Sequence, residues 1–471
     1  MLEYRKILFD QLTPISIYHK LKERFPNELS LLFESAVYTE EGNYSFIFIG
    51  AKERLTHKNG KTFYDKEGKI EEVDENPFSF LKRYYKGVDS KKYRELSKSL
   101  NIGFVDGFVG YIGYDLVKVF EPVLKPYMDN LKDELDIPDL ELIRPKLTAA
   151  FSHKSNTLVL MSFDGEYKNL LDEIVEYLKS PCRYIPIKKS EIDFSRGKFA
   201  FDKERFFEMV KKSKDMIKSG DVFQIVISNR FTQFANIDRL SFYRILRSKN
   251  PSPYMFLLEF EDFAIEGSSP EVMVALKDSH ILLRPIAGTR RRGDTWEKDK
   301  ANEFEMVNDE KERAEHLMLI DLGRNDVGKV AKVGTVHVPA IMRVERYSHV
   351  MHMVSDVEAV LDEKYDMFDL FSATFTAGTM TGTPKIRAME LIAEFEGLKR
   401  SYYSGSVGYF GFDGNMDTAI TIRTSLLKDD RIVFQAGAGI VADSKPELEY
   451  LEVKNKLGAL MSSLNDLKEE E

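Results

Sequence analysis

The spacing of strand-like runs is the feature that most constrains the fold of this chain. Short apolar runs at residues 44–49, 104–114, 158–161 and 222–231 are separated by polar turns. Helix-like stretches interrupt these runs without regular alternation. Strands that cluster in this way favour antiparallel sheets over a doubly wound parallel sheet. We therefore expect an α+β fold.

The length and one connector-like stretch suggest two regions. A chain of 471 residues exceeds the usual size of a single hydrophobic core. Residues 180–200 contain Pro181, Pro186 and Gly197 and resemble a connector. We place the division at 1–189 and 190–471. A helix follows the connector, with Asp202 as its expected N-cap and Gly220 as its stop.

Charge and cysteine content exclude several classes of function. The net charge is −9, which disfavours nucleic acid as a partner because phosphate binding needs a basic face. No stretch approaches the ~20 apolar residues of a membrane helix, and no signal peptide is evident. Cys182 is the only cysteine, so neither an internal disulfide nor a cysteine-based zinc site is expected. A cytoplasmic enzyme is consistent with these features.

Residues 285–293 combine a tight turn with three arginines. Gly288 allows a close approach of the backbone to a ligand, and Thr289 adds a hydroxyl. Arg290 to Arg292 offer planar donors that suit carboxylates or phosphates. The pattern suggests an anion site. The alternative is a solvated basic turn.

Two pairs of glutamates share one spacing. Glu312 and Glu315 lie three residues apart in a predicted helix over 305–320, and therefore on one face. Glu449 and Glu452 repeat this spacing on a second predicted helix. Oxygen ligands from both helices would suit Mg²⁺. The alternative is that they are surface glutamates with lysine partners, as Lys456 would be for Glu452.

The second of these helices has a recognisable start. Ser444 and Glu447 have the spacing of a capping box, and Pro446 suits the first turn. A further helix start is predicted where Thr383 would cap and Pro384 would occupy the first helical position, with Gly397 after the last turn. Its free N–H groups would attract an anion. The glycine spacing does not fit a nucleotide-binding P-loop.

Two further motifs can be read in two ways. Residues 437–442 match a dinucleotide fingerprint as a string, but no helix opens at Ile440. Close backbone approach to a ligand is one interpretation, and a β-bulge is the other. His349 and His352 would face opposite sides of a strand, so one of them could point into a cavity. A lone histidine is more often structural than catalytic.

Together these motifs resemble the chorismate-utilising enzymes, and within them the large subunits of anthranilate synthases. The resemblance is dense from about residue 200 to 462 and looser before it. Its pieces are Phe223-Gln224, 267–271, 285–293, 312–326, His352, 376–390, 403–409, 420–423 and 435–452. It implies two antiparallel sheets packed face to face, with helices outside. It also implies a lyase that converts chorismate and ammonia to anthranilate and pyruvate, the first step of tryptophan biosynthesis.

The resemblance also implies the roles of individual residues. Mg²⁺ would be held by Glu315 and Glu452, with Glu312 and Glu449 in support. Glu271 would be the general acid and His352 the base that rearomatises the ring. Residues expected to contact the substrate are Gly288, Thr289, Thr379, Tyr403, Arg423, Gly437, Ala438 and Gly439.

Two positions select among members of the family. Ala287 stands where aminodeoxychorismate synthases typically carry a lysine, and Gln224 stands where isochorismate synthases carry a lysine that activates water. Neither side chain can act as nucleophile or base. Both residues therefore point to ammonia as the nucleophile, although an aminodeoxychorismate synthase without its lysine remains the nearest alternative.

The resemblance implies two further partners. Cys182 lacks the glycine-rich elbow of a glutaminase thiol, so a separate glutamine amidotransferase subunit would supply ammonia. Residues 31–36 and 250–255 look like the family's feedback-inhibition segments. L-Tryptophan would bind there as an inhibitor, at Ser35, Pro253, Tyr254 and Met255. A catalytically silent tryptophan-binding subunit is the alternative from a different class.

Overall fold

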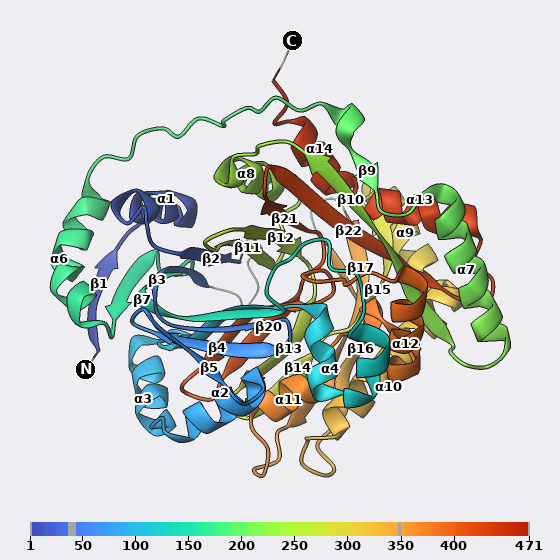
Figure 1. Cartoon of the computed structure of the whole chain (residues 1–471), viewed down its shortest axis with the longest axis horizontal. Helices are drawn as coiled ribbons and strands as arrows, with labels where there is room; N and C mark the ends of the chain where they lie inside the picture. Colours follow the sequence, from blue (N-terminus) through green and yellow to red (C-terminus); the bar gives the residue numbers. More distant parts are fainter. Residues whose placement is uncertain (1, 36–43, 347–349, 470–471) are drawn as a thin grey trace.

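Two antiparallel sheets face each other, and helices cover their outer surfaces (Figure 1). This architecture comes from a computed structural model that describes residues 2–35, 44–346 and 350–469. The largest hydrophobic core lies between the sheets and takes Phe46 and Phe48 from one and Val274 and Val407 from the other. The expected α+β sandwich with helices outside is confirmed.

The first sheet carries strands from both ends of the chain. Neighbouring strands, in order, are β1 (Glu3–Leu8), β8 (Thr157–Ser162), β7 (Leu140–Ser152), β3 (Tyr44–Lys58), β2 (Ser30–Glu34), β11 (Tyr254–Glu259), β12 (Ala264–Ser269), β21 (Thr424–Lys428), β22 (Arg431–Ile440) and β10 (Gln224–Phe234). The short strands β9 (Lys198–Phe199) and β18 (Gly382–Thr383) also pair with β10.

The second sheet shares β3 and β7 with the first. It continues through β6 (Gly107–Ile112), β19 (Ser406–Gly411), β20 (Met416–Ile420), β13 (Val272–Lys277), β14 (His280–Leu283) and β17 (Val350–Val360). On the other side of β3 lie β4 (Lys61–Lys66) and β5 (Lys69–Val73). β15 (Ile286–Arg291) and β16 (His337–Arg346) pair with β17.

A bend in β3 and β7 lets both strands pass from one sheet to the other. β3 pairs with β2 before Gly50 and with β4 after it, and its register against β7 shifts between Ala51 and Glu53. Gly50 has φ +70°, a conformation that glycine adopts without strain. Pro145 of β7 lies opposite Ala51, where the ladder is already irregular and a missing N–H costs little.

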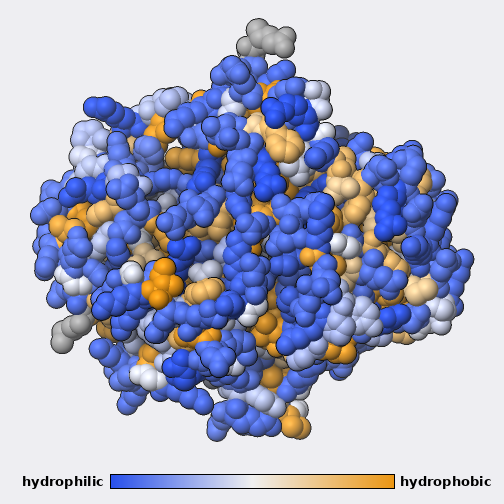
Figure 2. Space-filling model, in the orientation of Figure 1, coloured by the Kyte–Doolittle hydropathy of each residue, from blue (hydrophilic) through white to orange (hydrophobic). Residues whose placement is uncertain are grey.

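Helices cover the outer faces in three groups. α1 (Pro14–Arg24) and α6 (Gly165–Lys179) cover one end of the first sheet. Its other end is covered by α7 (Lys203–Lys218), α8 (Arg239–Lys249), α12 (Lys385–Glu396), α13 (Pro446–Lys456) and α14 (Gly458–Asn465). Beside the second sheet lie α2 (Pro77–Lys86), α3 (Ser90–Leu100), α9 (Trp296–Asn308), α10 (Glu310–Gly328) and α11 (Met367–Thr374). Figure 2 shows a surface dominated by hydrophilic residues with small hydrophobic groups between them.

The two regions of the sequence are interleaved in space. The connector after α6 runs as a long extended segment along the outside of the molecule to β9 (Figure 1). However, β2 pairs with β11, and β6 pairs with β19. Both sheets therefore contain strands from before and after residue 189. No described helix is long and apolar enough to cross a membrane.

Local signals at helix ends were partly right. Asp202 caps α7 by accepting a hydrogen bond from the Arg205 amide, and Gly220 follows its end with φ +85°. The helix expected over 305–320 is wrong as a single element, because Asp309 is extended and ends α9 before capping α10.

Two predicted caps do not form. Lys445, not Ser444, is the N-cap of α13, and the Ser444 hydroxyl accepts a hydrogen bond from the Val441 amide instead. Pro384 is the N-cap of α12, while Thr383 belongs to β18 and pairs with Gln224. At Ser444 a hydrogen bond with nearby backbone replaces the cap, whereas at Thr383 pairing with a distant strand keeps the residue out of the helix start. The predicted Gly397 stop is present, with φ +62°.

Candidate active site

Glu271 and Thr379 meet at the centre of the candidate site. Glu271 lies between β12 and β13, and Thr379 lies on a short 3-10 turn (Gly378–Met380) before α12. The Thr379 hydroxyl donates to Glu271 Oε1 at 2.9 Å. Burial raises the pKa of Glu271 to about 7, although the Thr379 hydrogen bond and nearby Arg423 oppose this shift. A carboxyl with this pKa can donate a proton near neutral pH.

His352 lies on β17, opposite Thr289 of β15. Its Nδ1 is 3.0 Å from Thr289 Oγ1 and 3.2 Å from the Gly288 carbonyl oxygen. Because a carbonyl oxygen only accepts, Nδ1 carries the hydrogen and Nε2 has the basic lone pair. Burial, with Arg423 nearby, lowers the pKa of His352 to about 4, so the ring is neutral at physiological pH. His349 lies outside the described residues.

A bulge at Gly288 shapes this part of the site. The register between β15 and β17 shifts between Ala287 and Thr289. Gly288 has φ +65°, and a Cβ at this position would lie 3.3 Å from both Glu312 Oε2 and Met306 Cγ. Glycine is therefore favoured by its backbone conformation and by the small space left for a side chain.

Gly437, Gly439 and Tyr403 form a second wall. A Cβ on Gly439 would lie 2.5 Å from Gln224 Nε2, and one on Gly437 would lie 3.0 Å from the Tyr403 hydroxyl. Ala438 faces the opposite side of β22 and packs under the covering helices, so its methyl group is not part of this wall. No helix opens at Ile440, as expected, because β22 continues through this residue.

The four glutamates lie on the facing helices α10 and α13. Glu315 accepts a hydrogen bond from Gln224 Nε2 at 3.0 Å. Burial raises its pKa, and the negative charges of Glu312 and Glu452 add to this effect. Glu449 has a raised pKa for the same reasons, burial first and then Glu452. The two pairs therefore lie within electrostatic reach of each other.

Cationic side chains already neutralise part of this charge. Arg290 pairs with Glu312 at 3.0 Å, and Lys456 pairs with Glu452 at 2.8 Å. Within the described ranges, no group of three or more histidine, cysteine or acidic side chains is close enough to hold a metal ion. The lysine-partner alternative for Glu452 is thus present in the structure.

The arginines of the 285–293 block are also engaged by the protein itself. Arg290 contacts Glu305 and Glu312, and Arg292 contacts Asp299 through two nitrogens. These pairs tie β15 to α9 and α10. Arg290 and Arg292 thus have carboxylate partners within the protein, and the anion site expected at these arginines stays a prediction, whereas Gly288 and Thr289 of the same block face His352.

The two segments expected to bind tryptophan are neighbours. β2 pairs with β11, and Met255 lies opposite Glu34, next to Ser35. Tyr254 donates a hydrogen bond to Asp417 Oδ1 at 3.1 Å. Pro253 directly precedes this strand. The structure thus brings together residues that are more than two hundred positions apart in the sequence.

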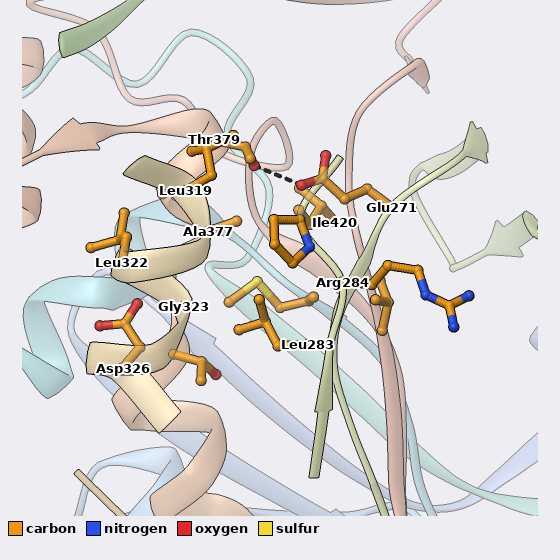
Figure 3. Close-up of a pocket in the computed structure, with 15 residues that line it drawn as sticks. Glu271, Leu283, Arg284, Leu319, Leu322, Gly323, Asp326, Ala377, Thr379 and Ile420 are labelled. Atoms are coloured by element: carbon orange, nitrogen blue, oxygen red, sulfur yellow. Dashed lines mark hydrogen bonds between the residues drawn. The ribbon is translucent and has the colours of Figure 1, made fainter. Parts of the chain in front are cut away.

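Glu271 lines one end of a small cavity (Figure 3). It has a volume of about 30 Å³ and is lined by Leu283, Leu322, Gly323 and Asp326, among others. Figure 3 shows the Glu271–Thr379 hydrogen bond at one end and Asp326 of α10 at the other. A space of this size admits only about one or two water molecules. A ring-sized ligand does not fit in a space of this volume.

Comparison with known proteins identifies the family. Residues 14–462 match the chorismate binding enzymes. The chain belongs to this family. It is similar to anthranilate synthase component 1 of Aquifex aeolicus, with 44% identity over 98% of this chain and 94% of that protein.

Solved structures of chorismate-binding enzymes agree with this assignment. The crystal structure of anthranilate synthase component I from Streptococcus pneumoniae has a TM-score of 0.79 and 33% identity, over 90% of this chain and 93% of that one. The menaquinone-specific isochorismate synthase from Escherichia coli shares the fold, with a TM-score of 0.72 at 17% identity over 98% and 95% of the two chains. The resemblance stated from the sequence is confirmed.

Sequence reasoning missed two residues of the candidate site. Lys456 donates to the Gly437 carbonyl oxygen at 2.9 Å as well as pairing with Glu452, so it joins the glycine wall to the glutamates. The spacing of four residues between Glu452 and Lys456 predicts an ion pair on the surface of a helix, but it does not predict the contact with Gly437. Arg400 is fully buried beside Tyr403, and a charged residue between Lys399 and Ser401 gives no sign of burial.

Proposed function

We propose that this chain converts chorismate and ammonia to anthranilate and pyruvate, as the large subunit of an anthranilate synthase. The observation that supports this most is the near full-length similarity to anthranilate synthase component 1 at 44% identity. The side chains of Gln224 and Ala287 fit ammonia as the nucleophile. Gln224 is not a base and donates its amide to Glu315, and Ala287 has no amine.

Binding of chorismate would use the wall opposite Glu271. The Arg423 guanidinium and the Tyr403 hydroxyl would hold the enolpyruvyl carboxylate, together with the amides of Gly437 and Gly439. Arg423 lies within electrostatic reach of both Glu271 and His352. A carboxylate bound at Arg423 is therefore held near the acid and the base. Gly288, Thr289 and Thr379 would line the ring.

The first stage requires an acid. Ammonia adds to the ring carbon beside the one that carries the carboxylate, the double bonds shift, and the 4-hydroxyl leaves as water. Glu271 would supply the proton for this departure. Its pKa of about 7 keeps about half of it protonated at pH 7.

The second stage requires a base. His352 would remove the ring proton as the enolpyruvyl group leaves as pyruvate, which makes the ring aromatic. The ring of His352 is neutral at physiological pH because burial lowers its pKa to about 4. Thr289 and the Gly288 carbonyl fix the orientation of the ring through Nδ1, which leaves Nε2 to take the proton.

The four glutamates fit an Mg²⁺ ion by chemistry and charge. Their oxygens are the ligands that Mg²⁺ prefers. Burial is the main cause of the raised pKa of Glu315, and the negative charges of Glu312 and Glu452 add a repulsion that a cation would relieve. Glu315 and Glu452 would hold the ion, with Glu312 and Glu449 in support. Bound there, Mg²⁺ would neutralise the ring carboxylate and so favour attack on the adjacent carbon.

Two partners belong to the same proposal. Cys182 is exposed in the connector and lacks the glycine-rich elbow of a glutaminase nucleophile. Ammonia would therefore come from a glutamine amidotransferase subunit. Tryptophan would bind where β2 and β11 run side by side, at Ser35, Pro253, Tyr254 and Met255. Calorimetry with tryptophan, run beside a turnover assay, tests this regulatory site.

One assay tests the catalytic proposal directly. The purified chain is incubated with chorismate and ammonium, with and without Mg²⁺, and anthranilate is followed by its fluorescence. We expect Mg²⁺-dependent anthranilate and no hydrolysis of glutamine by the chain alone. A para-isomer precursor as the product, or turnover that is unchanged in excess chelator, would contradict the proposal.

A further inference from the structure

We propose that the buried pair Arg400–Glu396 is the positioning element that sets the chorismate-binding geometry of Tyr403, Gly437 and the Thr379 turn. This inference rests on the proposed function. Arg400 follows α12, and its side chain is 1% exposed. Its hydrogen bonds go to Glu396 and to two backbone carbonyl oxygens, so it acts through the segments that carry the residues assigned above.

Arg400 bonds to three separate segments. Its Nη1 donates to the Met380 carbonyl oxygen at 2.8 Å, on the turn that carries Thr379. Its Nη2 donates to the Val226 carbonyl oxygen at 2.8 Å, and Val226 lies opposite Gly439 in the sheet. Nε and Nη2 also hold Glu396 through both carboxylate oxygens, at 2.9 and 2.7 Å.

Glu396 extends this connection to the next position of the glycine wall. Its Oε1 accepts hydrogen bonds from the Ser228 amide at 2.8 Å and from the Ser228 hydroxyl at 2.9 Å. Ser228 lies opposite Gly437 in the sheet. Arg400 and Glu396 therefore hold β10 at Val226 and Ser228, which lie opposite Gly439 and Gly437.

Tyr403 is held by the same guanidinium. The centre of the Arg400 guanidinium lies 5.7 Å from the Tyr403 ring centroid and 5.0 Å from that of Tyr114. Cation–π contacts of this kind are favourable where both partners are desolvated. Tyr114 belongs to the N-terminal region, and its amide donates to the Ser401 carbonyl oxygen. Arg400 thus contacts the rings of Tyr114 and Tyr403, one from each region of the sequence.

Energetics favour a geometric role for this pair. Replacing a buried ion pair with well-packed hydrophobic residues is often neutral or stabilising, so stability alone does not explain its presence. A lysine would keep the charge but not the planar fork, and one ammonium group cannot reproduce the set of bonds to Glu396, Met380 and Val226. The arrangement of these bonds is therefore the property to test.

Arg230 provides a matched control. It is also buried on β10, at 2% exposure, and donates to Gln435 and to the Lys399 carbonyl oxygen. It lies two residues beyond Ser228 and bonds to neither the Thr379 turn nor Val226. Its connection to the proposed binding wall is indirect, because Gln435 in turn donates to the Ser228 hydroxyl at 2.8 Å, so Arg230→Lys imposes a similar loss of buried contacts one step further from the wall.

The experiment compares Arg400→Lys with Arg230→Lys in the full-length protein. We measure KM for chorismate, apparent KM for ammonium and kcat, and also the equilibrium affinity for chorismate, which does not require turnover. We expect Arg400→Lys to raise KM and Kd for chorismate at least tenfold while the KM for ammonium changes less than twofold. Arg230→Lys should leave all of these within twofold.

The control outcomes separate positioning from general destabilisation. A merely structural role would lower kcat through loss of active protein and leave both KM values unchanged. Glu396→Gln, which keeps the side-chain volume and one acceptor oxygen, is the second variant and should raise KM for chorismate by a smaller factor. The proposal would be overturned if Arg400→Lys or Glu396→Gln left the affinity for chorismate unchanged. It would also be overturned if Arg230→Lys raised the KM for chorismate as much as Arg400→Lys does. Failure of wild-type turnover would instead count against the proposed function.

Discussion

The hydrogen bond between Thr379 and Glu271 should set the alkaline limit of catalysis. The Thr379 hydroxyl donates to Glu271 at 2.9 Å and lowers the pKa of a carboxyl that burial raises to about 7. A hydrogen bond to a charged group contributes about 1.5–3 kcal/mol, and one pKa unit corresponds to about 1.4 kcal/mol. Thr379→Val removes this bond and should raise the pKa of Glu271 by roughly one to two units.

The sign of the effect follows from the role of Glu271. As the acid it must be protonated, so kcat/KM falls as pH rises through its pKa in the free enzyme. In Thr379→Val this fall should begin roughly one to two pH units higher than in the wild type, even if the maximal rate is lower. Thr379→Ser keeps the hydroxyl and should leave the position of the fall unchanged.

Initial rates of anthranilate formation at low chorismate concentration provide the measurement. Total ammonium must be adjusted at each pH so that free ammonia stays constant, because otherwise its own titration distorts the profile. Excess Mg²⁺ is kept the same throughout. A profile for Thr379→Val that coincides with the wild type, or that shifts toward lower pH, would refute Glu271 as the acid controlled by this bond.

Three further predictions use other parts of the structure. His352→Ala should bind chorismate but accumulate the aminated diene, detected by chromatography of quenched reactions, and normal anthranilate output would exclude His352 as the base. Gly439→Ala should push Gln224 away from Glu315, because its Cβ would lie 2.5 Å from Gln224 Nε2. We expect weaker chorismate binding by calorimetry with little change in melting temperature, and unchanged affinity would contradict this. Glu266 is buried with both carboxylate oxygens unbonded, and burial, followed by Glu259, raises its pKa well above the usual range. The contribution of Glu266 to the free energy of unfolding is fully present below the pKa that this carboxyl has in the unfolded chain. Above that pH it is lost at about 1.4 kcal/mol per pH unit until the higher pKa of the folded state is reached. Glu266→Gln should therefore become more stable than the wild type as pH rises from 5 to 8 in urea unfolding, and a pH-independent difference would count against it.

Parts of the fold followed from local sequence signals. The start and end of α7 were predictable because Asp202 and Gly220 act through bonds and torsions within their own neighbourhood. Thr383 and Ser444 were misleading because other interactions take precedence: Thr383 joins a strand beside Gln224, and the Ser444 hydroxyl accepts a hydrogen bond from the Val441 amide. A cap is a local signal, but strand pairing across the chain overrides it.

The site could be predicted unevenly for a related reason. Glu271, His352 and Thr379 stand in motifs that the family resemblance made recognisable. In the structure the Thr379 hydroxyl donates a hydrogen bond to Glu271. The engagement of Arg290 by Glu312 and the burial of Arg400 depend on how helices and strands from distant parts of the chain pack. Such pairings have no periodic or compositional trace in a single sequence.

The strand pairings between the regions before and after the connector have a consequence for engineering. β2 pairs with β11 and β6 pairs with β19, so cutting the chain at the connector would leave both sheets with open hydrogen-bonding edges and apolar interior residues facing water. Removing the N-terminal region is therefore a poor route to a smaller active enzyme. Under the proposed function, release from inhibition by tryptophan would have to come from single substitutions within the intact chain, because the proposed tryptophan site and the proposed catalytic residues share the same two sheets.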